Sequence, residues 1–220
     1  MDLVPVSEYW DVILKSRETP VIGLIYRIPP RFWRDISKIQ EELRSIDKRH
    51  VYAKPSTLHI TIKAFGMLGA GIDEIKLGSI LSRTEKVVSE FSPFEISLKG
   101  VSFFPTSIYV KVEDPLQQFR MINKRLTDEF GDEIEKSEYD ADAFIPHVTI
   151  ATFNSKEAPE VISKVKSGEF QNLEFGSAQV FELEAIEGRL YLALGTDDVQ
   201  DGAFSYLQAF ELGKYMRSKA

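Results

Sequence analysis

The sequence predicts an α+β fold made of two related lobes, each with a mainly antiparallel sheet. Two segments, HITIKAF at 59–65 and HVTIATF at 147–153, agree at His, Thr, Ile and Phe, and they lie 147 − 59 = 88 residues apart. Around each segment the expected order is helix, His-x-Thr strand, helix, strand, strand. This period is too long for a solenoid, and the expected strands outnumber the helices. Two pseudo-symmetric lobes are therefore expected.

The elements of the first half follow from apolar periodicity, β-branched runs and turn residues. Residues 7–16 are expected to form a short helix with Ser7 as its N-cap. The elements expected after it are a strand at 21–28, a helix at 32–49, the first His-x-Thr strand at 57–65, a glycine loop at 66–71, a helix at 73–91, and strands at 94–104 and 107–113.

The second half repeats this order. Pro115 is expected to open a helix that runs to about residue 130, followed by an acidic loop at 132–142. The later elements are the second His-x-Thr strand, a helix at 157–167, strands at 178–187, 189–195 and 204–212, and a basic tail with Lys214, Arg217 and Lys219. The halves have no linker rich in Gly, Ser or Pro between them, so residues 1–220 are predicted to form a single domain with two interleaved lobes.

Composition and charge narrow the class of function. The chain has 43% hydrophobic and 11% aromatic residues, enough for a substantial core. Its net charge of 27 − 34 = −7 argues against a protein that grips long stretches of nucleic-acid backbone, but not against one that handles a nucleic-acid end. The absence of cysteine removes disulfides, thiolate metal sites and a cysteine nucleophile.

Targeting signals and other catalytic motifs are missing from the sequence. The N-terminus lacks the pattern of a signal peptide, and no apolar run approaches the ~20 residues that cross a bilayer. We therefore expect a cytoplasmic protein without a membrane partner. The sequence contains no nucleophile elbow, no P-loop and no His-Glu-x-x-His. No cofactor and no metal site are predicted, because the acidic loop lacks the spaced ligands of a calcium site.

The two His-x-Thr segments carry the candidate chemistry. Alternate residues of a strand share a face, which places His59, Thr61, Lys63 and Phe65 on one side, and likewise His147, Thr149, Ala151 and Phe153. Two histidines that face each other across a cleft can divide the roles of general acid and general base near neutral pH. The Thr61 and Thr149 hydroxyls would donate hydrogen bonds to anionic oxygens. Lys63 could add positive charge for a phosphate.

Simpler interpretations stand beside these roles. A single His-x-Thr strand is often ordinary strand surface, and the matched pair in a chain with three histidines is what favours function. Lys63 is as compatible with an exposed strand lysine as with a phosphate ligand. Phe65 and Phe153 are interpreted as core or groove floor. His50 is interpreted as a residue at a helix end.

With its two motifs in register, the sequence resembles the 2H phosphoesterase superfamily, within it the group of 2′-5′ RNA ligases and RNA 2′,3′-cyclic phosphodiesterases. The resemblance rests on His59-Ile60-Thr61-Ile62 and His147-Val148-Thr149-Ile150, with flanking Leu58, Lys63, Gly66 and Pro146 and the middle segment 98–105. It covers roughly residues 20–212 and leaves residues 1–20 as an N-terminal extension. It implies a bilobal fold with a pseudo-two-fold axis, outer helices and a central groove that holds both motifs.

The activity implied by the resemblance is metal-independent opening of a 2′,3′-cyclic phosphate to a 2′-phosphate, with 2′-5′ RNA ligation in some members. The expected partner is an RNA end or a nucleotide that carries a cyclic phosphate, bound by a monomer. Relatives of the bacterial ligase type often have an arginine after the second motif, where this chain has Thr152. A basic contact to the substrate is therefore expected to be either missing or supplied from elsewhere, with Arg27 and Lys63 as candidates. The alternatives are a non-catalytic binding module for such phosphates and an enzyme for a small cyclic nucleotide.

Overall fold

Two five-stranded sheets form the framework of the computed structural model, which describes residues 2–9, 19–134, 137, 139–189 and 203–214. The strand orders are β10-β9-β1-β3-β4 and β2-β7-β6-β5-β8. Apart from the short parallel pairing of β4 with β3, neighbouring strands are antiparallel. The predicted two-lobed α+β class is confirmed.

The strands are β1 (Val21–Arg27), β2 (Val51–Tyr52), β3 (His59–Leu68), β4 (Gly71–Ile72), β5 (Phe94–Phe103), β6 (Ser107–Glu113), β7 (His147–Thr152), β8 (Glu174–Val180), β9 (Glu182–Gly188) and β10 (Phe204–Glu211). The α-helices are α2 (Trp33–Ile46), α3 (Glu74–Ser89), α4 (Gln118–Phe130), α5 (Pro159–Val165) and α6 (Gly168–Gln171), and the 3₁₀ turns are η1 (Val6–Tyr9), η2 (Pro30–Phe32), η3 (Pro55–Thr57), η4 (Gly131–Glu133) and η5 (Ala141–Ala143).

Most expected elements occur within a few residues of their predicted bounds, and the differences have local causes. The strand predicted at 178–187 is two strands, because the chain turns from one sheet to the other at Phe181. Helix α4 starts at Gln118 rather than Pro115, since Gln117 adopts a left-handed conformation with φ 53°. The short strands β2 and β4 were not predicted. Residues 10–16 of the first predicted helix and residues 190–195 of a predicted strand lie outside the described residues.

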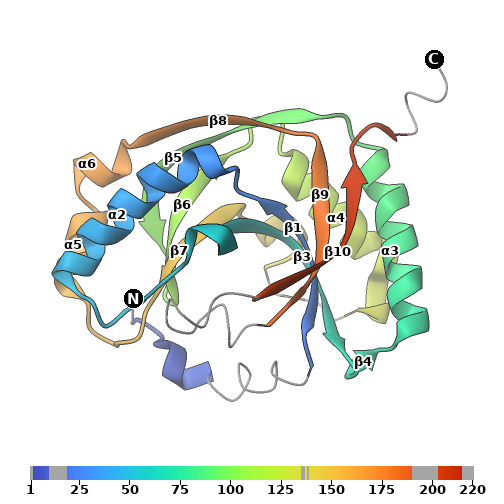
Figure 1. Ribbon diagram of the computed structural model, residues 1–220, viewed down its shortest axis with the longest axis horizontal. Helices are drawn as coiled ribbons and strands as arrows, with labels where there is room; N and C mark the ends of the chain where they lie inside the picture. The colour runs from blue at the N-terminus through green and yellow to red at the C-terminus, as the bar shows by residue number, and fades with distance from the viewer. Residues whose placement is uncertain (1, 10–18, 135–136, 138, 190–202, 215–220) are drawn as a thin grey trace.

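Helices cover the outer faces of the two sheets, as Figure 1 shows. Helices α3 and α4 pack on the sheet that contains β3, whereas α2, α5 and α6 pack on the sheet that contains β7. Strands β3 and β7 contact each other in the middle of the molecule. The apolar residues between the histidine and threonine positions, Ile60 and Val148, are fully buried. The histidines themselves are half-buried, so the histidine side of each strand is the less covered side.

Both histidine strands contain a bulge three residues after the histidine, and β3 contains a second one at Phe65. In β3, Thr61 pairs with Ile25 and Lys63 pairs with Leu24, so that Ile62 has no partner in β1. In β7, Thr149 pairs with Tyr109 and Ala151 pairs with Ile108, so that Ile150 has no partner in β6. A β-bulge of this kind shifts the following residues to the opposite face. The bulges at Ile62 and Ile150 stand at the same position of the repeat, three residues after each histidine.

The bulges correct one sequence prediction. Lys63 and Ala151 were expected on the faces of His59 and His147, respectively, but both are almost completely buried. Phe65 and Phe153 are buried too, which confirms their interpretation as core residues. The bulges therefore remove Lys63 and Ala151 from the faces of the histidines, and each histidine keeps the threonine two residues later on its face.

Candidate active site

The His59 ring is held by the backbone just before it. Its Nδ1 lies 2.7 Å from the carbonyl oxygen of Thr57, in the 3₁₀ turn η3. Because a carbonyl can only accept, Nδ1 carries the proton, and in the neutral ring Nε2 presents its lone pair. Nε2 lies 3.1 Å from Thr61 Oγ1, so the hydroxyl donates to it when the ring is neutral. The motif thus selects one tautomer and one ring orientation.

The His147 ring is held in the same way. Its Nδ1 lies 2.7 Å from the carbonyl oxygen of Ile145, again two residues earlier and just after a 3₁₀ turn, η5. Nε2 is again left as the reactive nitrogen. Both histidines and Thr149 are half-buried, and Thr61 is exposed. Each lobe therefore presents one imidazole Nε2 and one threonine from the same strand.

The surroundings lower the pKa of both histidines. Burial lowers the pKa of His59 to about 4, and the positive charges of Arg27 and His147 act in the same direction, against the hydrogen bond to Thr57. Burial likewise lowers the pKa of His147, opposed by the hydrogen bond to Ile145. The effect of His147 on His59 means that the two rings lie within electrostatic reach of each other. Without a bound anion, both rings are neutral at pH 7.

Aromatic rings line the two histidines. Phe204 of β10 meets the His59 ring edge-on, with 4.9 Å between centroids. Phe104 and Tyr109 stack on each other at 4.2 Å, and both meet the His147 ring, at 5.0 and 5.3 Å. Sequence reasoning missed these three residues, because the turns and pairings that place them are not local. These ring contacts are part of the burial that lowers the pKa values of both histidines.

Arg27 is the cation beside His59. It is the cross-strand partner of His59. Its guanidinium donates three hydrogen bonds to the Glu184 carboxylate, at 2.8–3.2 Å, and one to the Ser56 carbonyl at 3.3 Å. Its side chain is 33% exposed. Of the two candidates for the missing cation, Arg27 is thus at the histidine pair.

Lys63 is not at the histidine pair, so its predicted placement is wrong. Its ammonium is buried, forms an ion pair with Asp140, and donates to Thr127 Oγ1 at 3.2 Å. Burial raises the pKa of Asp140, but hydrogen bonds from Lys63, the Ser137 N–H and Asn123 outweigh it and lower the pKa overall. Lys63 neutralises a carboxylate of the predicted acidic loop instead of facing a ligand.

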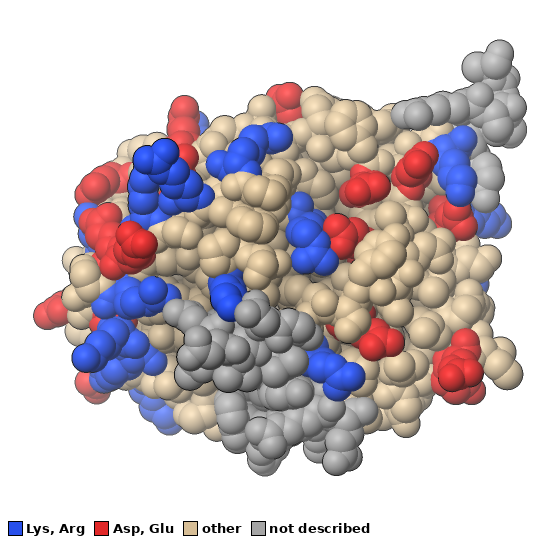
Figure 2. Space-filling view, in the orientation of Figure 1, with Lys and Arg blue, Asp and Glu red and all other residues tan. Residues whose placement is uncertain are grey.

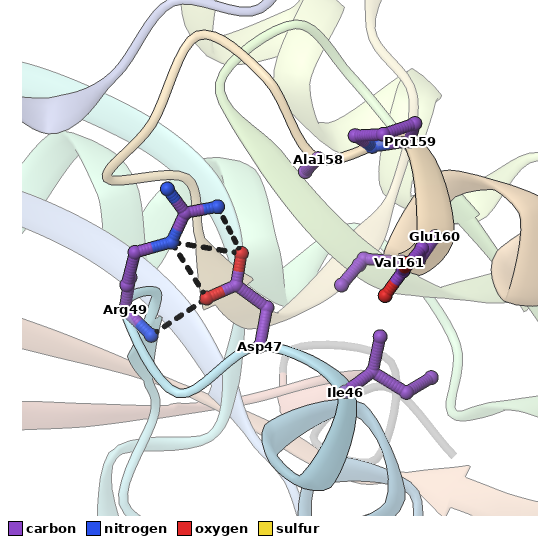
Figure 3. Close-up of a pocket in the computed structure, with 7 residues that line it drawn as sticks. All are labelled: Ile46, Asp47, Arg49, Ala158, Pro159, Glu160 and Val161. Atoms are coloured by element: carbon purple, nitrogen blue, oxygen red, sulfur yellow. Dashed lines mark hydrogen bonds and ion pairs between the residues drawn. The ribbon is translucent and has the colours of Figure 1, made fainter.

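A separate hollow of about 320 Å³ lies between the end of α2 and the start of α5 (Figure 3). Its lining residues are Ile46, Asp47, Arg49, Ala158, Pro159, Glu160 and Val161. Asp47 and Arg49 are paired to each other there by hydrogen bonds of 2.6–3.1 Å. Neither histidine motif contributes to this hollow.

His50 follows α2 and is buried. Its Nδ1 accepts from the Asn154 N–H at 3.3 Å, and its ring packs edge-on against Phe153 at 5.2 Å. The third histidine is thus a packing residue behind β7, away from the paired face.

Surface charge is mixed rather than segregated on the face that Figure 2 shows. Lysine and arginine side chains alternate there with aspartate and glutamate, so this face has no continuous basic band of the kind that tracks a nucleic-acid backbone. Among the described residues, no three His, Asp or Glu side chains gather as a group that could hold a metal ion. No described helix combines the length and apolar character that a bilayer crossing requires.

A two-lobed α+β protein that presents one His-x-Thr strand from each lobe has the form of a 2H phosphoesterase. The family model of the 2′-5′ RNA ligase superfamily matches residues 28–188. The chain belongs to this superfamily, as its motifs predicted.

Curated relatives carry the more specific names. An RNA 2′,3′-cyclic phosphodiesterase of Methanothermobacter thermautotrophicus is 31% identical over 153 residues, which cover 67% of this chain and 78% of the relative. A protein of the same name from Methanocaldococcus jannaschii is 28% identical over 158 residues, covering 67% of this chain and 82% of the relative.

Solved structures share the fold at low sequence identity. TT0787 of Thermus thermophilus has a TM-score of 0.63 at 19% identity, covering 88% of this chain and 98% of its own. E. coli LigT complexed with 3′-AMP has a TM-score of 0.64 at 12% identity, covering 89% and 99%. These likenesses support the bilobal architecture.

Proposed function

We propose that the protein is a metal-independent phosphodiesterase that opens 2′,3′-cyclic phosphates at RNA ends to 2′-phosphates. The observation that carries the proposal is the matched geometry of the two histidines. Each Nδ1 is bound to the carbonyl two residues earlier, which makes Nε2 the nitrogen that can exchange a proton with the substrate; the His59 Nε2 lies 3.1 Å from the Thr61 hydroxyl. The names of the curated relatives support the same reaction class.

The reaction needs one neutral and one protonated imidazole. The Nε2 of the neutral histidine takes a proton from water, and the water oxygen forms a new bond to phosphorus. The P–O3′ bond breaks, and the other histidine gives its Nε2 proton to O3′. The Thr61 and Thr149 hydroxyls donate to the non-bridging oxygens, where negative charge builds up. Proton exchange with water then restores the starting protonation states of the two imidazoles.

The lowered pKa values fit this scheme once the substrate is included. An anion next to an imidazole favours its protonated form. A bound cyclic phosphate would therefore raise the pKa of the nearby histidines and allow one of them to serve as the acid. Arg27, beside His59, would add positive charge on the same side of the phosphate.

The test is an RNA oligonucleotide with a 2′,3′-cyclic phosphate, incubated with the protein in EDTA, with the product analysed for a 2′-phosphate. His59→Ala and His147→Ala should each lower kcat by ~10²–10⁴-fold, the range of general acid–base groups. His50→Leu is the control, because His50 lies outside the pair, and it should retain turnover. Normal turnover in either alanine variant contradicts the mechanism.

The same assay separates the alternatives. A binding module would show no turnover, while both alanine variants would lose affinity for the RNA end. A preference for small cyclic nucleotides would appear as faster turnover of a cyclic mononucleotide than of the oligonucleotide. Ligation would replace water with the 5′-hydroxyl of a second RNA, and the product would be a 2′-5′ bond. The superfamily match is the reason to include this last arm.

A further inference from the structure

Two buried amide side chains occupy equivalent places in the two lobes. Gln40 of α2 and Asn123 of α4 are 4% and 1% exposed, respectively. Each lies in the apolar stripe of its helix, in the buried series Ile36, Ile39, Gln40, Leu43 and in the series Phe119, Ile122, Asn123, Leu126. A polar group on such a face costs free energy unless it is hydrogen-bonded. The Gln40 amide donates two hydrogen bonds, and the Asn123 amide donates two and accepts one.

Both amides bind the bulge of a histidine strand. The Gln40 Nε2 donates to the Ile150 carbonyl at 2.8 Å, and the Asn123 Nδ2 donates to the Ile62 carbonyl at 2.8 Å. Ile150 is skipped in the pairing of β7 with β6, and Ile62 is skipped in the pairing of β3 with β1. A bulge disrupts the ladder locally, so its backbone groups need other partners. The helix behind each strand supplies one side-chain donor, and the Ile150 carbonyl also accepts from the Ala53 N–H at 3.0 Å.

Both amides also bind the segment that precedes a histidine. The Gln40 Nε2 donates to the Ala53 carbonyl at 2.7 Å, and the Asn123 Oδ1 accepts from the Ala141 N–H at 2.6 Å. Ala53 and Ala141 each stand six residues before a histidine, since 59 − 53 = 6 and 147 − 141 = 6. Those segments contain the carbonyls of Thr57 and Ile145 that orient the imidazoles.

We propose that Gln40 and Asn123 are positioning residues of the paired-histidine site, each fixing the bulge of one histidine strand. A fixed bulge sets which side chains of the strand face the other lobe. Thr149 precedes the bulge held by Gln40, and Thr61 precedes the bulge held by Asn123. Gln40 contacts the bulge of the His147 strand and the segment before His59, and Asn123 contacts the bulge of the His59 strand and the segment before His147. Each amide therefore links the two lobes of the site. This inference rests on the proposed function for its kinetic consequences.

The kinetic test uses Gln40→Met, which keeps the size of the side chain and removes both donated hydrogen bonds. We expect kcat to fall roughly 10²-fold, because small displacements of reacting groups carry penalties of that size, while KM changes little. The matched control is Gln171→Met. The Gln171 Nε2 also donates to two backbone carbonyls, Val101 O at 2.9 Å and Val165 O at 2.7 Å. The control should lower the melting temperature similarly and retain its kcat.

The second test needs no turnover. The chain has three histidines, so the ring resonances can be assigned by NMR with one substitution for each. Gln40→Met should shift the His147 ring signals more than those of His59, and Asn123→Leu should do the reverse. The inference is overturned if the histidine ring signals are unshifted in both variants, or if Gln40→Met lowers kcat no more than Gln171→Met does. If the wild-type protein lacks turnover, only the proposed function fails, and the NMR result still decides this inference.

Discussion

Lys63 and Asp140 form a buried ion pair that joins the first histidine strand to the loop before the second. The Lys63 side chain is fully buried, and that of Asp140 is 12% exposed. At the equivalent positions of the other lobe, 88 residues away, Tyr52 and Ala151 are cross-strand partners. One lobe thus uses a salt bridge where the other uses an apolar contact.

The first prediction concerns this ion pair. Lys63→Met should lower the free energy of unfolding by about 3–5 kcal/mol, because it leaves a largely buried carboxylate without its cation. The double variant Lys63→Met/Asp140→Leu should recover most of the loss. Urea unfolding of the three proteins measures both effects. A raised KM with unchanged stability would instead make Lys63 a substrate ligand, as the sequence alone suggested.

The second prediction concerns the two threonines. Thr61→Val and Thr149→Val keep the side-chain shape and remove a hydroxyl that faces the proposed phosphate position. Each should lower kcat by about 10²–10³-fold, the range found for the loss of one donor to a developing oxyanion. Steady-state kinetics on the cyclic-phosphate RNA measures the change. Full activity in both variants would exclude the threonines from the reaction.

The third prediction concerns Thr84, a threonine outside the two His-x-Thr motifs. Thr84 of α3 is fully buried, and its hydroxyl has no hydrogen-bond partner among the described residues. Thr84→Val should therefore raise the free energy of unfolding by about 1 kcal/mol, because it removes an unsatisfied buried polar group. Turnover should not change. A destabilised protein in urea unfolding would mean that the hydroxyl has a partner after all.

The fourth prediction is a loss of stability in mild acid. His59 has a pKa of about 4 in the folded protein, and the pKa of His147 is lowered too. In the unfolded chain both pKa values lie near 6.5. The unfolded state therefore binds more protons between these limits, so the free energy of unfolding should fall as the pH drops from about 6.5 toward 4.

The unfolding midpoint in urea at pH 7 and at pH 4.5 measures this effect. The double variant His59→Gln/His147→Gln should show a smaller difference between the two midpoints. The carboxyl group of Asp47, whose pKa is about 2, contributes only at lower pH. If the difference between the two midpoints were the same in the wild type and in the double variant, the prediction would be contradicted.

The fifth prediction concerns Arg27. Its charge lowers the pKa of His59, and its ion pair with Glu184 holds it beside the ring. Arg27→Gln should raise the pKa of His59, both by removing the cation and by freeing the Glu184 carboxylate. KM for the cyclic phosphate should rise about tenfold, a loss of about 1.4 kcal/mol in binding. NMR titration and kinetics check the two effects, and an unchanged His59 titration would contradict the first.

The sequence was sufficient to predict the two lobes, the two His-x-Thr strands and most other elements, since these depend on local patterns and on an internal repeat. It was not sufficient for Lys63. Strict alternation along β3 predicted an exposed side chain, and only the register against β1 reveals the bulge at Ile62. The partner Asp140 lies 77 residues away, in a stretch that looks like a solvated acidic loop.

Gln40 and Asn123 did leave a signal in the sequence. Each is a single amide at the same place in an apolar helical stripe, where an apolar residue would be expected. That pattern indicates a buried polar contact. It does not name the contact, because Ile150 and Ile62 become neighbours of these helices only when the chain crosses between lobes.

That crossing has a mechanical consequence. Helix α2 follows a strand of one sheet and packs on the other, α4 does the converse, and the chain returns at β9 to the sheet in which it began. If the two lobes opened as rigid bodies, all the chain segments that cross between the two sheets would have to deform together. If the two histidines act together as proposed, we expect the spacing between their imidazoles to be set when the chain folds and not by a closing motion on the substrate.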